Sequence, residues 1–359
     1  MEQKNNPSNG LVAPNGTDKR QNDKNQTINQ TNQEQSTQSP QDKYYTSRST
    51  NSMLEEMLFK EQPVLDKGFI RLVDYMGGDE AIVQAARVSY GKGTKTLNDD
   101  RALIRYLLKH KHTTPFEMCE IKFHIKTPLF IARQWLRHRT ASVNEYSARY
   151  SIMEEDYYIP NLEQIKTQSV SNKQGRGEEF SSEKANVIRK ELQTISKEAF
   201  GYYYNFLEEN GEINNSKGAT NSQNNLLQQG TSAPEINSIP SKPILAKEIA
   251  RIILPVNVYT QFYWKINLHN LLHFLKLRAD YHAQYEIREY AIKILEVVKL
   301  WVPVTYQAFL DYSLNAKLFS QQEVALIKHL IEGKEIKMED SGLSKREWAE
   351  FNHNFKGKD

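Results

Sequence analysis

Alternating apolar and polar positions mark two strands of this chain. Residues 68–76 are rich in β-branched and aromatic side chains and stop at Gly77-Gly78, which predicts a strand. Between residues 121 and 126 apolar side chains alternate with polar ones, the period of a strand with one buried face. On this pattern His124 faces solvent.

Apolar residues at helical spacing follow each strand. Asp79 is placed to cap a helix whose apolar face ends near Arg87. A second helix is predicted to begin at Asp99 and to end before His110. Residues 113–117 are typical of a turn. A third helix is predicted to begin at Thr127-Pro128 and to end near Arg137, because proline at the first helical position loses no intrahelical hydrogen bond.

The second half of the chain is mainly helical in pattern. Residues 245–254 predict a helix that Pro255 stops, and a long helical region follows from Leu268. The buried stripe near its end comprises Ile287, Tyr290, Ala291, Ile294, Leu295 and Val298. The pattern as a whole implies a sheet with helices packed on it.

Two polar tracts interrupt this pattern. Residues 1–42 contain 16 Asn and Gln but only five apolar side chains, too few to offset the entropy of ordering the chain, so we expect residues 1–52 to be a disordered tail. Residues 214–242 carry nine Asn or Gln and predict a low-complexity insertion in a surface loop. A single domain over 53–313 remains, followed by a charged extension over 314–359 with one amphipathic helix.

Overall charge and cysteine content exclude several protein classes. A formal net charge of +3 gives little steering towards nucleic acid polymers or membranes. The lone Cys119 excludes an intrachain disulfide framework and a cysteine-rich zinc site. No apolar run approaches the roughly 20 residues that span a bilayer. We therefore expect a soluble, cytoplasmic protein without a metal site.

Candidate chemistry is concentrated between Arg133 and Arg149. This stretch holds four arginines against one acidic residue, Glu145, and its polar partners are amides and hydroxyls rather than lysines and glutamates. Arginine offers a planar fork of donors suited to phosphate and base edges, which favours a nucleotide site. The simpler alternative is a solvated basic helix end.

The same stretch carries a recognisable motif. Arg137-His138-Arg139, followed after seven residues by Ser147, resembles the RHRxxxxxxxS signature of flavin-dependent thymidylate synthases. Further blocks lie in the expected order: AARVSY, HTTPFE, ARIILPVNVYTQFYWKIN and LRADYHAQYEI. Several separated blocks make chance similarity improbable, whereas a short motif alone would be weak.

The resemblance implies a fold, a reaction and an assembly. It implies an α+β fold, a single domain built on a central, mainly antiparallel sheet packed by helices. The implied reaction methylates dUMP to dTMP, with 5,10-methylenetetrahydrofolate as carbon donor, reduced FAD as reductant and NADPH to re-reduce the flavin. The implied assembly is a homotetramer whose subunits share the sites.

Individual residues receive roles from the same resemblance. Arg278 is the implied catalytic residue. The implied dUMP-binding residues are Gln134, Trp135, Leu136, Arg137, Glu145, Tyr146, Ser147, Ala148, Arg149, Arg251 and Arg278. The implied FAD-binding residues are Ser89, Thr114, Glu117, Arg137, His138, Arg139, Asn144, Glu145, Asn267, His269, His273 and His282. His112 and Tyr150 match positions near the flavin and folate.

Other interpretations of these residues stay open. The arginine-rich stretch could form an RNA-binding module, which predicts colourless protein and salt-sensitive binding. The histidines could build a metal-dependent nucleotide hydrolase, which predicts inhibition by chelators. Arg278 could pair with Asp280 or Glu286 for stability alone. Cys119 lies outside the Pro-Cys context of cysteine-dependent thymidylate synthases, so we expect it to pack as a small apolar side chain.

Overall fold

A five-stranded antiparallel sheet forms the centre of the protein. The computed structural model describes residues 48–88, 97–170, 175–207 and 244–357. The sheet has the order β1-β2-β3-β7-β4 and every neighbouring pair runs antiparallel. Its strands are β1 (Glu61–Val64), β2 (Gly68–Met76), β3 (Glu120–Pro128), β4 (Ser142–Glu145) and β7 (Tyr259–Asn267), and a separate hairpin joins β5 (Lys166–Gln168) to β6 (Arg176–Glu179).

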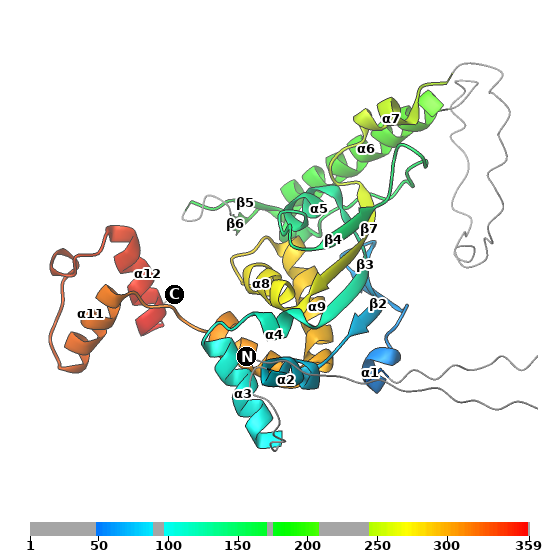
Figure 1. The fold of residues 1–359 in the computed structure, drawn as a ribbon. Coiled ribbons are helices and arrows are strands. Elements are labelled where there is room, and N and C mark those ends of the chain that lie inside the picture. The colour runs from blue at the N-terminus through cyan, green and yellow to red at the C-terminus, as the bar shows by residue number, and fades with distance from the viewer. Residues whose placement is uncertain (1–47, 89–96, 171–174, 208–243, 358–359) are drawn as a thin grey trace, which may run out of the picture. The chain divides into compact units, whose positions relative to one another are not determined.

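Helices supply the rest of the architecture (Figure 1). They are α1 (Ser52–Glu55), α2 (Asp79–Arg87), α3 (Leu97–Lys109), α4 (Thr114–Glu117), α5 (Leu129–Trp135), α6 (Ser182–Leu207), α7 (Lys247–Ala250), α8 (Leu268–Arg278), α9 (Tyr285–Trp301), α10 (Pro303–Phe309), α11 (Gln321–Ile331) and α12 (Lys345–Lys356). Short turns of 3-10 helix are η2 (Leu162–Gln164), η3 (Arg251–Ile253) and η5 (Met338–Asp340), and η4 (Leu310–Leu314) is π-helical. The predicted α+β class is confirmed.

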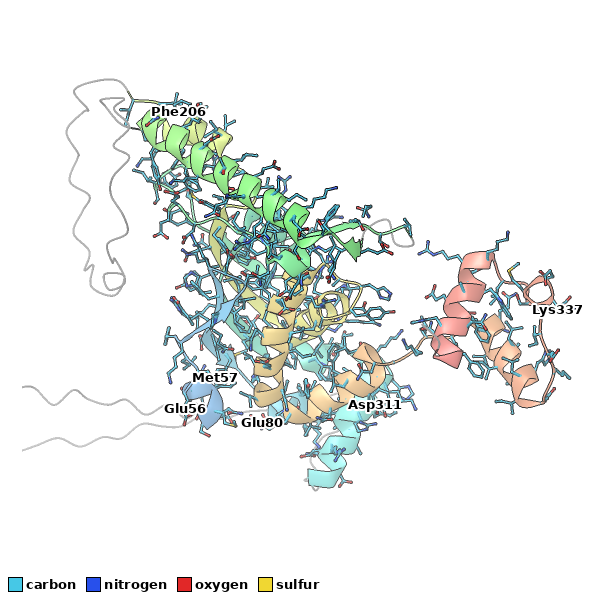
Figure 2. All side chains as sticks on the ribbon, turned by 180° about the vertical axis from the view of Figure 1, so that it is seen from behind. Glu56, Met57, Glu80, Phe206, Asp311 and Lys337 are labelled. Carbon is cyan, nitrogen blue, oxygen red and sulfur yellow. The ribbon has the colours of Figure 1, made fainter. Side chains whose placement is uncertain are left out.

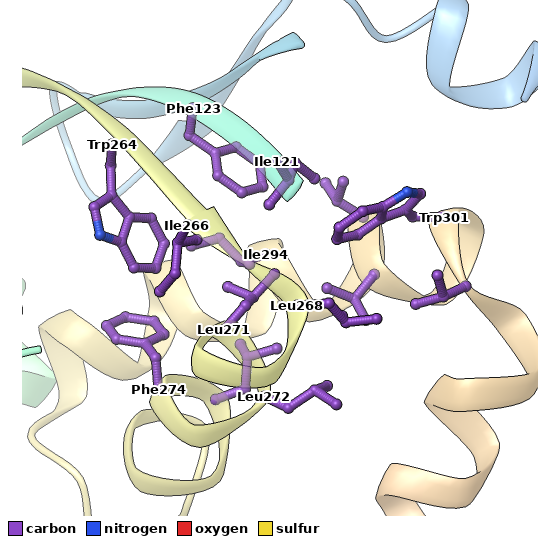
Figure 3. Close-up of a cluster of buried hydrophobic side chains, with 14 of the residues drawn as sticks. Ile121, Phe123, Trp264, Ile266, Leu268, Leu271, Leu272, Phe274, Ile294 and Trp301 are labelled. Atoms are coloured by element: carbon purple, nitrogen blue, oxygen red, sulfur yellow. The ribbon is translucent and has the colours of Figure 1, made fainter. Parts of the chain in front are cut away.

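The main hydrophobic core lies between one face of the sheet and helices α5, α8 and α9. Alternation along β3 and β7 sends Phe123 and Trp264 to this face, where they are paired in register and fully buried. Phe274 of α8 points towards Trp264 (Figure 3), with ring centroids 5.1 Å apart. This core fixes α8, and with it the helix end that carries Arg278.

The cap at the start of α2 differs from the prediction. The helix begins at Asp79 itself, after Gly78, and Gly78 provides no side-chain cap. The carboxylate of Asp79 instead accepts hydrogen bonds from the backbone N–H groups of Val304 (2.8 Å) and Thr305 (3.0 Å) and from the Thr305 hydroxyl (2.6 Å). Asp79 therefore caps α10, a helix more than 220 residues further along the chain.

Several other element boundaries also differ from the prediction. Residues 114–117 form the short helix α4 rather than an open turn, and the helix predicted over 245–254 divides into α7 and η3. The charged extension contains two capped helices, α11 and α12, where one was expected.

The segment η4 is joined to α3 by an ion pair. Asp311 of η4, which Figure 2 labels, pairs with Arg105 of α3.

The predicted N-terminal tail ends earlier than residue 52. Residues 1–47 lie outside the described residues. Arg48 donates a hydrogen bond to the carbonyl oxygen of Tyr75 at 2.6 Å, and Asn51 caps α1 through its side chain. Residues 48–52 therefore belong to the folded domain, because their polar groups are bonded to it.

His124 is half-buried rather than solvent-facing. Its ring stacks on Tyr263 with centroids 4.9 Å apart, and its two nitrogens contact Arg71 and Gln261 at 3.1 and 2.9 Å. Burial, followed by the charge of Arg71, lowers the pKa of His124. Neighbouring long side chains on the outer face of the sheet cover a position that strand alternation alone assigned to solvent.

The predicted insertion, residues 214–242, lies outside the described residues, but the points where its segment leaves and rejoins the domain are described. The N–H of Leu245 donates to the carbonyl oxygen of Phe206, at the end of α6, at 3.0 Å (Figure 2). The described residues that flank the segment 208–243 are therefore adjacent.

Replacing residues 208–243 by an eight-residue Gly/Ser linker is expected to leave the domain stable. The free energy of closing a loop changes only with the logarithm of its length, so the free energy of unfolding should shift by no more than about 1–2 kcal/mol. Urea denaturation of both chains measures this shift. A loss above that range would show that the replaced segment contributes packing contacts.

Candidate active site

The RHR motif emerges where α5 ends. Leu136 is the C-cap of α5, so the three residues that follow leave the helix axis. They line a cavity of about 320 Å³ that α8 and the end of β7 complete. The described lining comprises Arg137, His138, Arg139, Thr140, Ile266, Asn270, His273, Leu277 and Arg278. It contains three guanidinium groups and no carboxylate, which suits an anionic ligand.

Arg278 and His138 form the most defined contact in this cavity. Nε of Arg278 donates to Nε2 of His138 at 3.2 Å, so Nε2 of the imidazole is unprotonated. Burial, followed by the charge of Arg278 and then His273, lowers the pKa of His138 to about 4. Burial and the nearby Arg137 also lower the pKa of Arg278. A neutral imidazole thus holds a half-buried cation.

This contact predicts a loss of stability in mild acid. His138 has a folded pKa of about 4 against an unfolded value of about 6.5. Below pH 6.5 the unfolded chain binds a proton that the native site does not, so stability is complete above pH 6.5 and falls as the pH drops towards 4. His138→Gln should lose less unfolding free energy between pH 7.5 and pH 5 than the wild type. His329→Gln, an exposed histidine of α11, should keep the wild-type dependence in the same urea titrations.

A second group gathers beyond β4. Arg149 forms an ion pair with the carboxylate of Glu248 at 3.2 Å, and Nε of Arg251 donates to the carbonyl oxygen of Glu248 at 3.3 Å. Ser147 accepts from the N–H of Arg149 at 3.3 Å, within the same turn. Two guanidinium groups about 100 residues apart in sequence therefore contact one residue, Glu248, and the Ser147 hydroxyl lies in the turn that leads to Arg149. This arrangement suits a phosphate dianion.

Between these two groups runs the edge strand β4. Its four side chains are exposed, and Glu145 accepts a hydrogen bond from the Thr260 hydroxyl at 2.7 Å. The hydroxyl of Tyr146 donates to the carbonyl oxygen of Ile152 at 2.9 Å, which fixes the turn after the strand. Asn144 and Glu145 thus lie on an open surface between the RHR motif and the Arg149 turn.

The remaining predicted site residues lie around α4 and α8. Thr114 and Glu117 belong to α4, which packs against α8. Asn267 caps α8 through its side chain, and His269 and His273 lie on that helix. His282 is exposed in the turn after α8, where its Nδ1 lies 2.9 Å from a carboxylate oxygen of Asp280.

Three further predicted residues lie apart from these groups or outside the described residues. Ser89 lies outside the described residues. The Trp135 side chain is fully buried in the core, so any nucleotide contact would use its backbone. His112 is exposed at the end of α3, where its ring centroid lies 5.8 Å from that of Tyr106.

The structure adds residues that the motifs did not indicate. Lys247 donates to the carbonyl oxygen of Tyr150 at 3.1 Å, and Glu248 joins Arg149 to Arg251. Gln284 bonds to Gln134. Lys247 and Glu248 precede Arg251 on the same turn of helix, a proximity that could have indicated them.

Within the described residues, no group of three or more His, Cys, Asp or Glu side chains is arranged to hold a metal ion. No helix of that part of the chain is long and apolar enough to cross a membrane.

Comparisons with known proteins give a consistent result. A family model described as thymidylate synthase complementing protein matches residues 71–304. A flavin-dependent thymidylate synthase of Rickettsia prowazekii (strain Madrid E) is 52% identical over 306 residues, which cover 85% of this chain and 97% of that protein. One from Ehrlichia ruminantium (strain Gardel) is 51% identical over 306 residues, covering 85% and 92%.

Solved structures agree with the sequence relatives. The UMP/dUMP methylase PolB of Streptomyces cacaoi, bound with 5-Br dUMP, superposes with a TM-score of 0.56 at 26% identity and covers 70% of this chain and 98% of its own. The matched family region contains the RHR motif, Arg251 and Arg278, and it exceeds half of the chain. The chain belongs to the family of flavin-dependent thymidylate synthases.

Proposed function

We propose that this protein methylates dUMP to dTMP, with FAD as its cofactor. The carbon comes from 5,10-methylenetetrahydrofolate, NADPH supplies the reducing equivalents, and tetrahydrofolate is released. The observation that carries this proposal is the carboxylate-free cavity in which the RHR motif meets Arg278. The RHR motif and Arg278 also lie within the region that the family model matches.

Binding of dUMP is assigned to the groups on both sides of β4. Ser147, Arg149 and Arg251 hold the phosphate, because both arginines contact Glu248 and Ser147 lies in the turn that leads to Arg149. A bound phosphate would replace the Glu248 carboxylate as the partner of Arg149. Gln134, Arg137, Glu145 and Arg278 contact the nucleoside. The remaining assigned positions are Leu136, Tyr146, Ala148 and the backbone of Trp135.

Arg278 activates the uracil ring in this proposal. Carbon transfer to C5 needs electron density there, and this density develops with negative charge on the N3 and carbonyl side of the ring. A guanidinium held by His138 is positioned before the reaction, so it stabilises this charge without reorganising. The positive charge of Arg137 lies close enough to repel that of Arg278. A negative charge that develops on the uracil relieves this repulsion, so the two arginines together favour it.

FAD fits the residues around α8. The cavity offers three guanidinium groups and a neutral imidazole, a set of groups suited to the pyrophosphate and to the carbonyl oxygens and ring nitrogens of a flavin. Arg137, His138, Arg139, Asn267, His269 and His273 would hold it, with Thr114, Glu117, Asn144, Glu145, His282 and Ser89. When bound, FAD supplies the reducing equivalents for the transferred carbon. His112 and Tyr150 are assigned to the folate.

Cys119→Ala is expected to keep full synthase activity. The thiol is fully buried, and burial, followed by the charges of Glu80 and Asp79, raises its pKa to about 12. A thiol that stays protonated cannot attack C6 of uracil. Initial rates of dTMP formation should match the wild type within about twofold, a change too small for loss of a covalent step. Abolished turnover in a folded, flavin-loaded variant would contradict the non-covalent mechanism.

We also propose a cytoplasmic homotetramer that shares its sites between subunits. Support comes from α6, where Val187, Leu192, Ile195, Tyr202 and Phe206 are exposed on one side of the helix. Helices that expose an apolar stripe bury it against a partner. Light scattering of the purified protein should give the molar mass of four chains.

One incubation tests the reaction. Protein, dUMP, 5,10-methylenetetrahydrofolate, FAD and NADPH should give dTMP and tetrahydrofolate, and the purified protein should show flavin absorbance bands. Dihydrofolate as the folate product would contradict a flavin-dependent reduction. Colourless protein that binds RNA, or inhibition by a chelator, would support one of the rival functions.

A further inference from the structure

A chain of hydrogen bonds leads from the buried Glu286 of α9 to the site residue Gln134. Glu286 is 1% exposed, and its Oε1 accepts from the Tyr158 hydroxyl at 3.1 Å and from the guanidinium of Arg176. Its Oε2 accepts from Nε2 of Gln284 at 2.9 Å. Oε1 of Gln284 in turn accepts from Nε2 of Gln134.

The buried carboxylate of Glu286 fixes the donor-to-acceptor direction of these hydrogen bonds. An ionised carboxylate paired with Arg176 can only accept hydrogen bonds, so Gln284 must turn its NH₂ group towards Glu286. The carbonyl oxygen of Gln284 then faces Gln134, and only the NH₂ group of Gln134 can satisfy it. A rotated Gln134 would place two acceptors against each other, which neither amide can satisfy.

The outer end of the chain is therefore an acceptor. With its NH₂ group engaged, Gln134 presents its carbonyl oxygen, which makes no hydrogen bond to any residue that the structure describes. The donors that dUMP offers are N3–H of the uracil and the 3′-hydroxyl of the sugar. An acceptor fixed in direction recognises either donor and rejects a ligand group that also accepts.

We propose that Gln284 and Glu286 are positioning residues for substrate recognition, which fix the amide of Gln134 so that its carbonyl oxygen receives a donor of dUMP. This inference rests on the proposed function, because Gln134 is assigned there to the nucleotide. It adds two residues that touch no substrate themselves and a reason for burying a carboxylate beside α5.

Gln284→Met tests the chain with little change of volume. Methionine has nearly the length of glutamine but neither donor nor acceptor, so Gln134 becomes free to rotate while Glu286 keeps Arg176 and Tyr158. Titration calorimetry with dUMP should show a Kd raised about five- to tenfold, the factor expected for one hydrogen bond to a neutral group. The kcat at saturating dUMP should change less than KM.

Tyr158→Phe is the matched control. It removes one hydrogen bond from the same carboxylate but leaves the arm through Gln284 intact. Its Kd for dUMP should stay within about twofold of the wild type, because the direction of the chain is unchanged. Equal weakening in both variants would indicate general disturbance of the buried network and would overturn the proposal.

Two analogues identify the donor that Gln134 receives. The 3-methyl derivative of dUMP lacks N3–H, and 2′,3′-dideoxyuridine monophosphate lacks the 3′-hydroxyl. The wild type should bind one of them more weakly than dUMP, and Gln284→Met should lose that discrimination. Full discrimination in Gln284→Met, or an unchanged Kd for dUMP, would overturn the inference while leaving the proposed function intact. A wild type that fails to bind dUMP would refute the proposed function and the inference together.

A second variant covers the case in which Gln284→Met does not fold. Glu286→Gln keeps the shape of the side chain, but its amide donates as well as accepts, so the direction of the chain is no longer imposed. Its Kd for dUMP should also rise severalfold. Unchanged binding in this variant would overturn the proposal.

Discussion

Arg278→Ala should lose about 10²-fold or more in turnover, the range seen when one preorganised electrostatic donor is removed from an active site. The guanidinium is half-buried at the end of α8 and is held by the unprotonated nitrogen of His138 at 3.2 Å. Because the uracil gains negative charge only as C5 reacts, the loss should appear in kcat as well as in dUMP binding. Steady-state rates at saturating dUMP measure it.

Two further variants make this result specific. Arg278→Lys should recover little activity, because an ammonium group cannot reproduce a planar contact with two donors. Arg288→Ala is a matched control, since Arg288 of α9 binds the carbonyl oxygen of Tyr281 at 2.6 Å and does not line the cavity. Near-normal kcat in a folded Arg278→Ala variant would refute the catalytic role.

The purely stabilising role considered for Arg278 finds no support in the described contacts. Its two candidate partners are bound elsewhere, because Asp280 contacts His282 and Glu286 pairs with Arg176. Among the described contacts, Arg278→Ala loses the hydrogen bond to His138, so its melting temperature should fall by about a few degrees at most. Measuring stability and kcat on one preparation separates the two roles.

Trp135→Ala should destabilise the protein by about 3–5 kcal/mol, the usual cost of emptying a core site of this size. The indole is fully buried among Phe262, Trp264, Phe274 and Tyr290, with ring centroids 4.9–5.7 Å away. No neighbour can collapse into the space without moving the sheet or α8. Urea unfolding of both proteins measures the difference.

Trp135→Phe and Tyr150→Ala separate core packing from ligand contact. The indole N–H has no hydrogen-bond partner among the described residues, so phenylalanine removes volume but no bond and should cost less than about 2 kcal/mol. Tyr150 is 76% exposed, and its replacement should change stability by only about 0.5 kcal/mol. Unchanged dUMP affinity in Trp135→Phe is expected, and a large loss would place the indole in the site.

Sequence patterns predicted the strands and helices whose apolar period is strong. β2 coincides with the predicted range, and β3 extends the predicted alternation by a few residues. β7 was not predicted, although Phe262, Trp264 and Ile266 alternate with polar residues as clearly as β3 does. α6 was also missed, because it exposes apolar side chains and buries few of its 26 residues.

The site was predictable where chemistry follows a motif and unpredictable where it depends on tertiary packing. The RHR motif directed attention to the cavity, but its contact between His138 and Arg278 joins residues 140 positions apart. Glu248 and Glu286 look like ordinary helix carboxylates in sequence. Their roles follow only from the fold, which brings arginines to both and excludes water from Glu286.

The position of β7 has a consequence for synthesis of the chain. This strand lies between β3 and β4, although it comes more than 110 residues after β4 in sequence. Until the ribosome has released residue 267, β3 carries an open edge and β4 has no strand to pair with. Open edges of this kind pair readily with other chains, and distant strand pairing is slow. The nascent chain therefore lacks the completed sheet beside the candidate site, and its open strand edges favour aggregation, until about three quarters of it has been made.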